Sequence, residues 1–410
     1  MSHHDLVLFP LQLAIMLTVA VIVGRCMNEL HWPAVVGELI GGIILGPTVL
    51  ASFAPNLYEW LFPTEGATPV AREAIVKVGM LFFLAFAGAE VSLSYARLQG
   101  LTVVWTSSMG IIVPFCLGFI LVILSPVLWG PPANNNSLRF ALVVATIMAI
   151  SALPVIAKIL IDLDLIKTEV GMIVMTAATL DDLIGWFLFT IILNSLETDA
   201  LFRPILWSAL CLIVLIILSL TAHYWLDKTT VRRLRPLFLG YGNLTAIVAI
   251  VVLATAAITE AVGIHSFFGA FLIGIALARP IRELNRLDRR KSRSFTYFLA
   301  SLYFVSIGLQ VDFAKNFDLL LVLLVLFMAC VGKIVGVWLG ARIGRLPSKE
   351  ALAVAFGMNA RGAMGIILAS LSLEHKLIDQ RAFVALVIMA LVTSIISGPA
   401  MKRMLAAKVS

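Results

Sequence analysis

The chain has 410 residues, of which 61% are hydrophobic and only 13% are charged, and its mean hydropathy is +1.04. Soluble domains are about 45–50% apolar and about 25% charged, so this composition excludes a soluble protein and predicts one that crosses a membrane many times. The net charge of +7 is explained by basic residues in loops on one side of that membrane, and it gives no indication of nucleic-acid binding.

Apolar runs that are separated by charged or Pro/Gly-rich loops predict thirteen transmembrane helices. The first run lacks the basic flank and cleavage site of a signal peptide, so we expect it to be a span. The four cysteines occur singly in apolar runs, without the spacing of a metal site, and are expected to be small apolar residues. The predicted spans are residues 6–26, 33–51, 73–93, 100–129, 137–161, 168–195, 203–223, 242–262, 264–279, 294–312, 318–343, 349–373 and 380–403.

The lysines and arginines predict the orientation of the chain. With the N-terminus outside, the cytoplasmic loops hold 21 of the 30 basic residues, the outer loops hold 7, and Lys333 and Arg361 lie inside the membrane. Clusters at 228–235 and 279–293 supply about half of the cytoplasmic set. We therefore expect a cytoplasmic C-terminus in a multi-pass protein of the bacterial inner membrane.

Two pairs of segments predict an internal repeat. Gly88–Leu93 is similar to Gly308–Phe313, and Gly37–Leu45 is similar to Gly269–Leu277. The members of each pair lie seven predicted spans apart, and an odd separation gives them opposite directions through the membrane. Two inverted six-helix halves, with the span 203–223 as a linker, are typical of a secondary transporter.

Polar residues and a proline mark the second and fifth predicted helices. Glu38 lies between glycines in the second helix, where a vestibule residue and a packing carboxylate fit the pattern equally well. In the fifth helix, Pro154 cannot donate a backbone hydrogen bond to Ile150, so we expect a break there, with a simple kink as the alternative. Thr146 and Ser151 lie near this point and are candidate ligands for an ion.

Asp181 and Asp182 lie at the centre of the sixth predicted helix, in an apolar run from Val170 to Leu193 that holds no other charge. A carboxylate at the bilayer midplane costs about 2.5–3.5 kcal/mol on insertion scales, so two adjacent ones indicate a functional site. Neighbours on a helix point about 100° apart, and the two carboxylates therefore face different surroundings. A structural pair that only holds helices together is the alternative.

The other half of the chain carries buried basic residues and a second interrupted helix. Lys333 lies about 12 Å from the cytoplasmic end of its run, which favours a carboxylate partner over snorkelling to the interface. The twelfth helix contains Gly357 and Gly362, with Asn359 and Arg361 between them. The fifth and twelfth helices are the fifth members of their halves, and matched interrupted helices predict a midplane ion site.

Five segments carry a resemblance that covers nearly the whole chain. They are Val36–Pro47, Ser151–Leu160, Ala177–Trp186, Gly263–Phe271 and Met358–Gly365. In this order they resemble the motifs of the monovalent cation:proton antiporter-2 family, in which the first three look like the helix-two signature, the broken helix and the ion-site helix. That family includes NapA-like sodium/proton antiporters, Kef-type potassium systems and plant cation/proton exchangers.

The resemblance implies an all-α NhaA/NapA-like fold, with two broken helices that cross at midplane, and a homodimer. It implies that Asp182 binds the monovalent metal ion or the proton, and that Asp181 pairs with Lys333. At the position of Asp181, Kef-type members commonly carry glutamine and plant exchangers often carry asparagine, so an aspartate there favours sodium as the transported cation. Trp186 and the segment that begins at Pro154 instead resemble the plant-like potassium branch. The implied parts are a scaffold with the dimer contact (1–93 and 242–312) and an ion-transport core (98–195 and 318–405).

These observations predict a secondary antiporter, rather than an enzyme, that exchanges Na⁺ or Li⁺ for H⁺ by alternating access without a cofactor. A K⁺/H⁺ antiporter or a Kef-like K⁺ efflux domain is the alternative of the same class. Three other functions are less favoured. An organic-anion symporter would bind its substrate through Arg361, and an intramembrane aspartyl protease would need its two aspartates on different helices, whereas those of this chain are adjacent on one helix. A membrane sensor would change conformation on binding an ion without transporting it. The sequence ends about seven residues after the last predicted helix and includes no soluble regulatory domain. A short member of the family and a truncated form of a longer protein are both consistent with this end.

Overall fold

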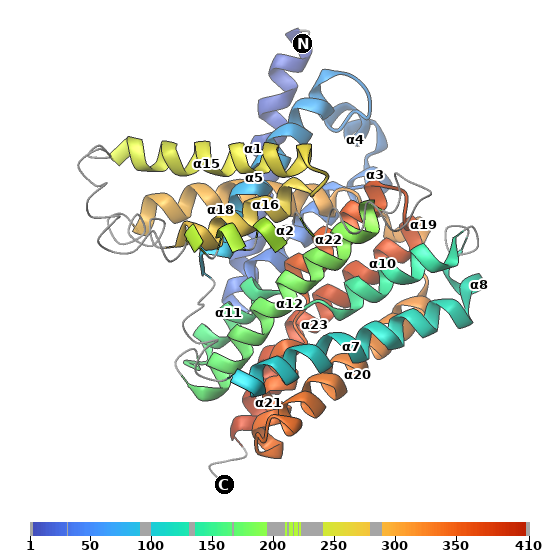
Figure 1. Cartoon of the computed structure of the whole chain (residues 1–410). Coiled ribbons are helices and arrows are strands. Elements are labelled where there is room, and N and C mark those ends of the chain that lie inside the picture. Colours follow the sequence, from blue (N-terminus) through green and yellow to red (C-terminus); the bar gives the residue numbers. More distant parts are fainter. Residues whose placement is uncertain are drawn as a thin grey trace. The chain divides into compact units, whose positions relative to one another are not determined.

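The computed structural model describes residues 3–30, 32–90, 100–130, 136–165, 168–194, 210, 213–215, 217–219, 221–222, 241–278 and 289–406. Every regular element among them is an α-helix (Figure 1), which confirms the all-α prediction for this part of the chain. By length and composition, six of the described helices can cross a membrane, or seven when a bent pair is counted as one span. The predicted linker span 203–223, residues 91–93 and the basic clusters at 228–235 and 279–293 lie largely outside the described residues.

Long spans alternate with short helical turns in the order of the sequence. The bounds are α1 (His3–Glu29), α2 (Ala34–Leu45), α3 (Leu50–Phe53), α4 (Pro55–Leu61), α5 (Ala67–Glu90), α7 (Gly100–Leu124), α8 (Pro126–Trp129), α10 (Ser137–Ala149), α11 (Leu153–Asp162), α12 (Glu169–Asn194), α15 (Tyr241–Ala261), α16 (Ser266–Ala276), α18 (Arg289–Gly308), α19 (Phe313–Asn316), α20 (Leu319–Ile343), α21 (Ser348–Met358), α22 (Gly362–Glu374) and α23 (Gln380–Ala406).

Two predicted spans are interrupted where their hydropathy indicates a continuous helix. The second predicted span is α2 up to Leu45, followed by the single turn of α3, because Pro47 has no N–H to continue the hydrogen-bond ladder. The fourth is interrupted at Ser125, since Pro126 disfavours helical geometry in the residue before it. Ala34–Phe53 nevertheless forms one candidate span and Gly100–Leu124 another, so both predicted spans are present, with ends that differ by a few residues.

The helices pack into two compact units. The first unit comprises Met1–Ala20, Asn56–Val91 and Leu193–Ser306. The second unit comprises Val21–Pro55, Ser92–Ile192 and Ile307–Ser410, and it contains all four charged residues predicted to lie deep in the membrane, Asp181, Asp182, Lys333 and Arg361. The division into a scaffold and an ion-transport core, with the boundaries given above, stays a prediction.

In the first unit, α16 packs against α5 and α15. Glycines allow the backbones to approach, because a Cβ atom at Gly274 of α16 would overlap the Ala85 carbonyl of α5. The rings of Phe83 in α5 and Phe304 in α18 meet edge to face, with 5.4 Å between their centroids. Close backbone packing and aromatic contacts thus hold this unit together.

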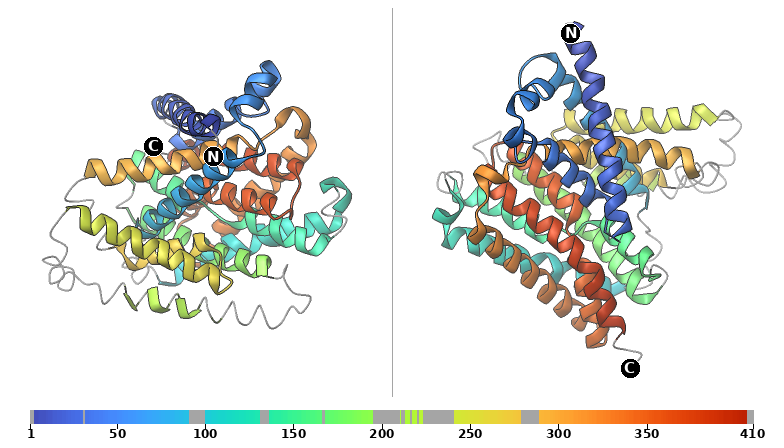
Figure 2. Two further views of the ribbon diagram at one scale, coloured as in Figure 1. Left: turned by 90° about the horizontal axis from the view of Figure 1, so that it is seen from above. Right: turned by 180° about the vertical axis from the view of Figure 1, so that it is seen from behind.

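In the second unit, α20 lies along α7 (Figures 1 and 2). A Cβ atom at Gly332 of α20 would lie 2.9 Å from the Cα atom of Pro114, and one at Gly344 would lie 2.7 Å from that of Thr102. Small residues at every fourth position are the usual way for membrane helices to approach this closely. The four glycines that face α7 form a ladder, which we call the glycine ladder, at Gly332, Gly336, Gly340 and Gly344.

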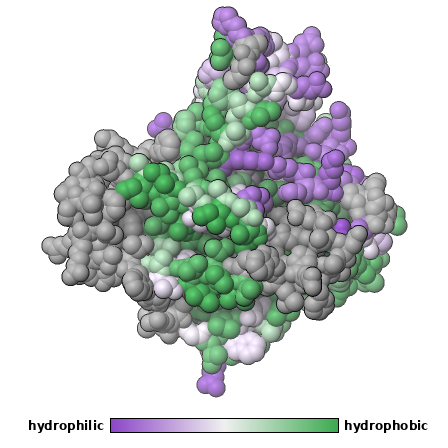
Figure 3. Space-filling model, turned by 45° about the horizontal axis from the view of Figure 1, so that its top comes forward, coloured by the Kyte–Doolittle hydropathy of each residue, from purple (hydrophilic) through white to green (hydrophobic). Residues whose placement is uncertain are grey.

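The opposite face of α20 is apolar and exposed. Leu320, Leu323 and Phe327 expose 63%, 53% and 63% of their surface and recur every three or four residues, on one side of the helix. Figure 3 shows wide hydrophobic areas on the face of the molecule that it draws. A stripe of this kind along a 25-residue helix is suited to contact with lipid hydrocarbon. It agrees with the long apolar helices, which make the chain a polytopic membrane protein.

Candidate functional site

The first broken helix consists of α10 and α11, and its break spans Ile150 to Ala152. Both end residues of the break have extended backbones, with ψ of 141° at Ile150 and 99° at Ala152. Pro154 lies in the first turn of α11, where its missing N–H needs no helical partner and its fixed φ suits the start of a helix. The break therefore ends at Ala152, two residues before the proline.

The second broken helix consists of α21 and α22, whose axes are bent by 43°. Gly362 begins α22 with a φ of +38°, in the region that favours glycine. The two breaks contact each other, because the backbone N–H of Ala152 donates to the carbonyl of Ala360 at 2.8 Å. The interruptions of the two helices thus form one crossing inside the second unit.

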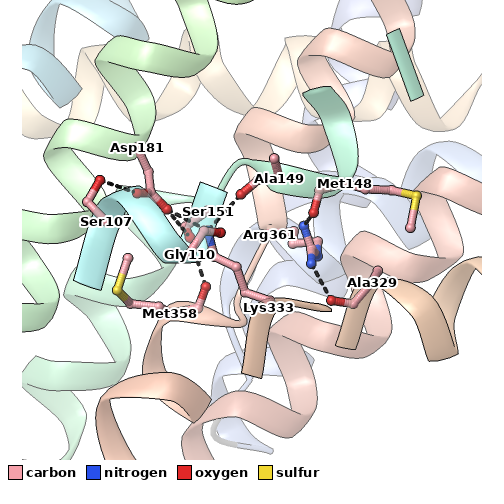
Figure 4. A network of polar contacts seen from close by, with 10 residues as sticks. All are labelled: Ser107, Gly110, Met148, Ala149, Ser151, Asp181, Ala329, Lys333, Met358 and Arg361. Atoms are coloured by element: carbon pink, nitrogen blue, oxygen red, sulfur yellow. Dashed lines mark hydrogen bonds and ion pairs between the residues drawn. The ribbon is translucent and has the colours of Figure 1, made fainter. Parts of the chain in front are cut away.

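A buried ion pair joins α12 to α20 beside this crossing (Figure 4). Lys333 Nζ lies 2.5 Å from Asp181 Oδ2, and neither side chain is exposed. The ammonium group also donates to the carbonyls of Gly110 at 2.9 Å and of Ala149 at 2.6 Å. Each of its three N–H bonds therefore has an acceptor, which is the arrangement that a buried ammonium ion requires.

Two serines complete the surroundings of Asp181. Ser107 of α7 donates to Asp181 Oδ1 at 2.8 Å. The Ser151 hydroxyl oxygen lies 2.9 Å from Asp181 Oδ2 and 2.8 Å from the carbonyl oxygen of Met358, the last residue of α21. A hydroxyl group has one hydrogen, so Ser151 donates to only one of these acceptors at a time.

Arg361 holds the carboxyl-terminal end of α10 from the other broken helix. Its Nη1 donates to the carbonyl of Met148, and its Nη2 donates to the carbonyl of Ala329 at 2.6 Å. With Lys333 on the carbonyl of Ala149, two positive side chains lie at the negative end of the α10 dipole. The last two carbonyls of α10 thus each accept a hydrogen bond from a positively charged side chain.

Asp182 has surroundings quite different from those of Asp181. It is 1% exposed, and its Oδ1 has no hydrogen-bond partner in the part of the chain that the structure describes. The backbone amide of Leu153, the first residue of α11, interacts with the same carboxylate. One aspartate of the pair is therefore surrounded by donors, while its neighbour presents a buried oxygen that no protein group satisfies.

The remaining predicted residues lie apart from this hydrogen-bond network. Thr146 donates to the carbonyl of Leu142 within α10. Asn359 Nδ2 lies 3.5 Å from the sulfur of Cys330 on α20, and its Oδ1 is buried without a partner among the described residues. Glu38 is buried on α2, and a Cβ atom at Gly357 would contact Met401 at 3.1 Å.

The structure also brings in residues that the sequence did not single out. Ser107 and the carbonyl of Gly110 come from α7, which lies against the glycine ladder of α20. A serine in an apolar helix is common, and a backbone carbonyl has no sequence signal at all. The repeated four-residue spacing of glycines on α20 does indicate that another helix packs closely beside Lys333, but it does not identify that helix.

We expect Gly362→Ala to disrupt the crossing of the broken helices. An alanine would be strained at a φ of +38°, and its Cβ atom would overlap the side chain of Val155 in α11. The variant should unfold with about 1–3 kcal/mol less stability and should lose most of its transport rate. Thermal unfolding in detergent and initial rates in proteoliposomes would measure the two effects.

The matched control for this substitution is Gly365→Ala, one turn further along α22. A Cβ atom at Gly365 would make an ordinary contact of 3.7 Å with Arg361, and Gly365 has no positive φ. This variant should behave like the unchanged protein. Equal behaviour of the two variants would show that neither the strain nor the overlap at Gly362 matters.

Residues 13–407 of the chain match the family described as sodium/hydrogen exchanger, transmembrane. The chain belongs to the sodium/hydrogen exchanger family. The expectation of a monovalent cation:proton antiporter is thereby confirmed at the level of the family. Sodium/hydrogen exchangers are transporters rather than enzymes, and they exchange cations for protons across a membrane.

This exchanger is similar to proteins of known type from three organisms. It is 30% identical over 403 residues to the Na(+)/H(+) antiporter NhaS4 of Synechocystis sp., with 97% of each chain covered. It is 26% identical over 411 residues to K(+)/H(+) antiporter 1 of Saccharomyces cerevisiae, covering 97% of this chain but only 46% of the yeast protein. The solved structure of the sodium proton antiporter MjNhaP1 from Methanocaldococcus jannaschii superposes with a TM-score of 0.70, at 16% identity and over 98% of both chains. The polytopic antiporter fold is therefore confirmed.

Proposed function

We propose that this exchanger moves Na⁺ or Li⁺ in one direction and H⁺ in the other by alternating access, and that Asp182 is the carrier carboxylate. The observation that carries the proposal is the buried Asp182 Oδ1, which has no partner among the described residues. A charged oxygen in such a place is costly unless a proton neutralises it or a cation pairs with it. The substrate ions supply the partner that the protein does not.

The contrast with Asp181 supports the choice between the two aspartates. Asp181 already interacts with Lys333, Ser107 and Ser151, so a cation there would have to displace protein donors. At Asp182 Oδ1 there is no such donor to displace among the described residues. One carboxylate cannot hold a proton and a cation together, and this competition couples the two fluxes without any further device.

The Asp181–Lys333 pair supports a second element of the proposal, electrogenic exchange. A cation that draws Asp181 away from Lys333 would leave the ammonium group with only the carbonyls of Gly110 and Ala149. Losing its carboxylate partner favours release of a proton from the lysine. Exchange would then move two protons for each cation. A measured stoichiometry of one proton per cation would exclude this element and leave Asp182 as the carrier.

A K⁺/H⁺ exchanger is the second candidate, and the similarity to the yeast K(+)/H(+) antiporter 1 favours it. The similarity to NhaS4, which covers 97% of both chains at a higher identity, favours sodium. A titration of Na⁺, Li⁺, K⁺ and Rb⁺ against proteoliposomes with an internal pH dye separates the two. We expect dye responses to Na⁺ and Li⁺ at lower concentrations than to K⁺ and Rb⁺. The reverse order would replace the first candidate by the second.

The proposal includes the setting of the protein. The excess of basic residues in one set of loops supports an N-terminus outside and a C-terminus in the cytoplasm, in a bacterial inner membrane. We propose a homodimer, as the family resemblance implies. Cross-linking in native membranes and cysteine labelling from each side of the membrane would test assembly and orientation separately.

A further inference from the structure

Helix α12 carries three buried threonines, and one of them is bonded differently from the others. Thr176 donates to the carbonyl of Met172 at 2.8 Å, and Thr179 donates to that of Met175 at 2.9 Å. These are the ordinary bonds of a helical threonine to the preceding turn. Thr190 is 1% exposed, yet its hydroxyl group has no hydrogen-bond partner in the part of the chain that the structure describes. The Thr190 hydroxyl group thus lacks the bond to the preceding turn that the other two threonines make.

The position of Thr190 on α12 relates it to the carrier carboxylate. Asp182, Trp186 and Thr190 are each 1% exposed and follow one another at four-residue spacing, which makes them a single row along the helix surface. The row rises about 12 Å from Asp182 toward the end of the helix at Asn194. Thr190 lies about 80° around the helix from Asp182 but opposite Asp181. It is therefore on the carrier side of α12, away from the ion pair.

The two ends of this row share an unusual property. Both Asp182 Oδ1 and the Thr190 hydroxyl oxygen are buried oxygens without a protein partner among the described residues. Buried polar groups are nearly always hydrogen-bonded, and each exception calls for a reason. Between them, the indole of Trp186 packs edge to face with Phe189, with 6.5 Å between the ring centroids, and places a large and mostly apolar ring in the row. A row with one such oxygen at each end suits a path along which a small hydrated cation moves.

We propose that the Thr190 hydroxyl is a ligand for the cation, or for a water of its shell, on the path between Asp182 and the Asn194 end of α12. This inference rests on the proposed function. A hydroxyl oxygen replaces a hydration water without adding charge, so it lowers the cost of dehydration but does not compete with Asp182 for the proton. Thr190 is thus a specificity-determining residue for the cation and takes no part in proton binding.

The test compares three variants in proteoliposomes with an internal pH dye. Thr190→Val keeps the shape of the side chain and removes the hydroxyl group, and we expect it to raise the KM for the cation about five- to tenfold. Its maximal rate and its dependence on pH should stay unchanged. Thr190→Ser restores the hydroxyl and should keep KM within about twofold. Thr176→Val removes a hydroxyl that is satisfied within the helix and should also keep KM within about twofold.

Protection of the folded protein by the cation is a second readout that a structural role would not affect. The concentration of Na⁺ that gives half-maximal thermal stabilisation should rise in Thr190→Val by the same factor as KM. An unchanged KM, or a variant that is only less stable in the absence of cation, would overturn the assignment of Thr190. An unmodified protein that drives no proton movement with any cation would instead overturn the proposed function, and the role of Thr190 with it.

Discussion

Replacing Asp182 with asparagine is expected to reduce cation-driven proton movement to the level of protein-free liposomes. The amide keeps the shape of the side chain, so the packing around it should remain intact. It can neither take up a proton in the working pH range nor pair with a cation through a negative charge. Proteoliposomes with an internal pH dye would measure the loss, and thermal unfolding would show that the fold is retained.

The control for this prediction is Asp164→Asn, in the turn between α11 and α12. Asp164 is exposed and has a φ of 55°, a conformation that asparagine adopts as readily as aspartate. This variant removes one carboxylate without touching the buried site, and its flux should match that of the unchanged protein. Undiminished flux in Asp182→Asn would show that another group carries the ions.

Lys333→Met is expected to cause the largest loss of stability of any single substitution proposed here. It leaves the Asp181 carboxylate buried without a positive partner and leaves the carbonyls of Gly110 and Ala149 without a donor. Breaking a buried pair from one side costs about 3–5 kcal/mol, because the remaining charge is not compensated. The unfolding temperature in detergent, followed through tryptophan fluorescence, should fall accordingly.

Two further variants determine whether the loss arises from the unpaired charge. Adding Asp181→Asn to Lys333→Met removes that charge and should recover most of the lost stability, since replacing both members of a buried pair is often nearly neutral. Lys77→Met removes a lysine from an exposed pair with Glu73 and should cost about 0–1 kcal/mol. A Lys333→Met variant as stable as Lys77→Met would contradict the importance of the buried pair.

The charged residues of the site are those that the sequence reveals most clearly. Asp181, Asp182, Lys333 and Arg361 stand out because each lies in a long apolar run, where a charge is costly. Helical geometry alone predicts that adjacent aspartates face different surroundings, and in the structure their partners do differ. What the sequence could not supply is the set of acceptors around the lysine, since two of the three are backbone carbonyls.

The helix interruptions were only partly predictable. The break before Pro154 has a polar residue and a proline at mid-span, and both indicate it. The interruptions at Pro47 and Pro126 have the same cause but lie near the ends of apolar runs, where hydropathy gives no sign of them. The unpartnered hydroxyl of Thr190 depends on its side-chain rotamer, which the residue type does not determine.

The glycine ladder limits how the helices α7 and α20 can move. Their backbones touch along three turns, so a shift of one helix along the other by a single residue, about 1.5 Å, would force carbonyl groups into Cα atoms. The two helices should therefore move together as one rigid body. Lys333 would then remain next to Gly110 during that movement. Any motion that opens the site to the other side of the membrane must therefore occur at other helix contacts. A disulfide engineered between α7 and α20 at positions other than the four glycines should leave transport intact, because a Cβ atom at a ladder glycine would overlap α7.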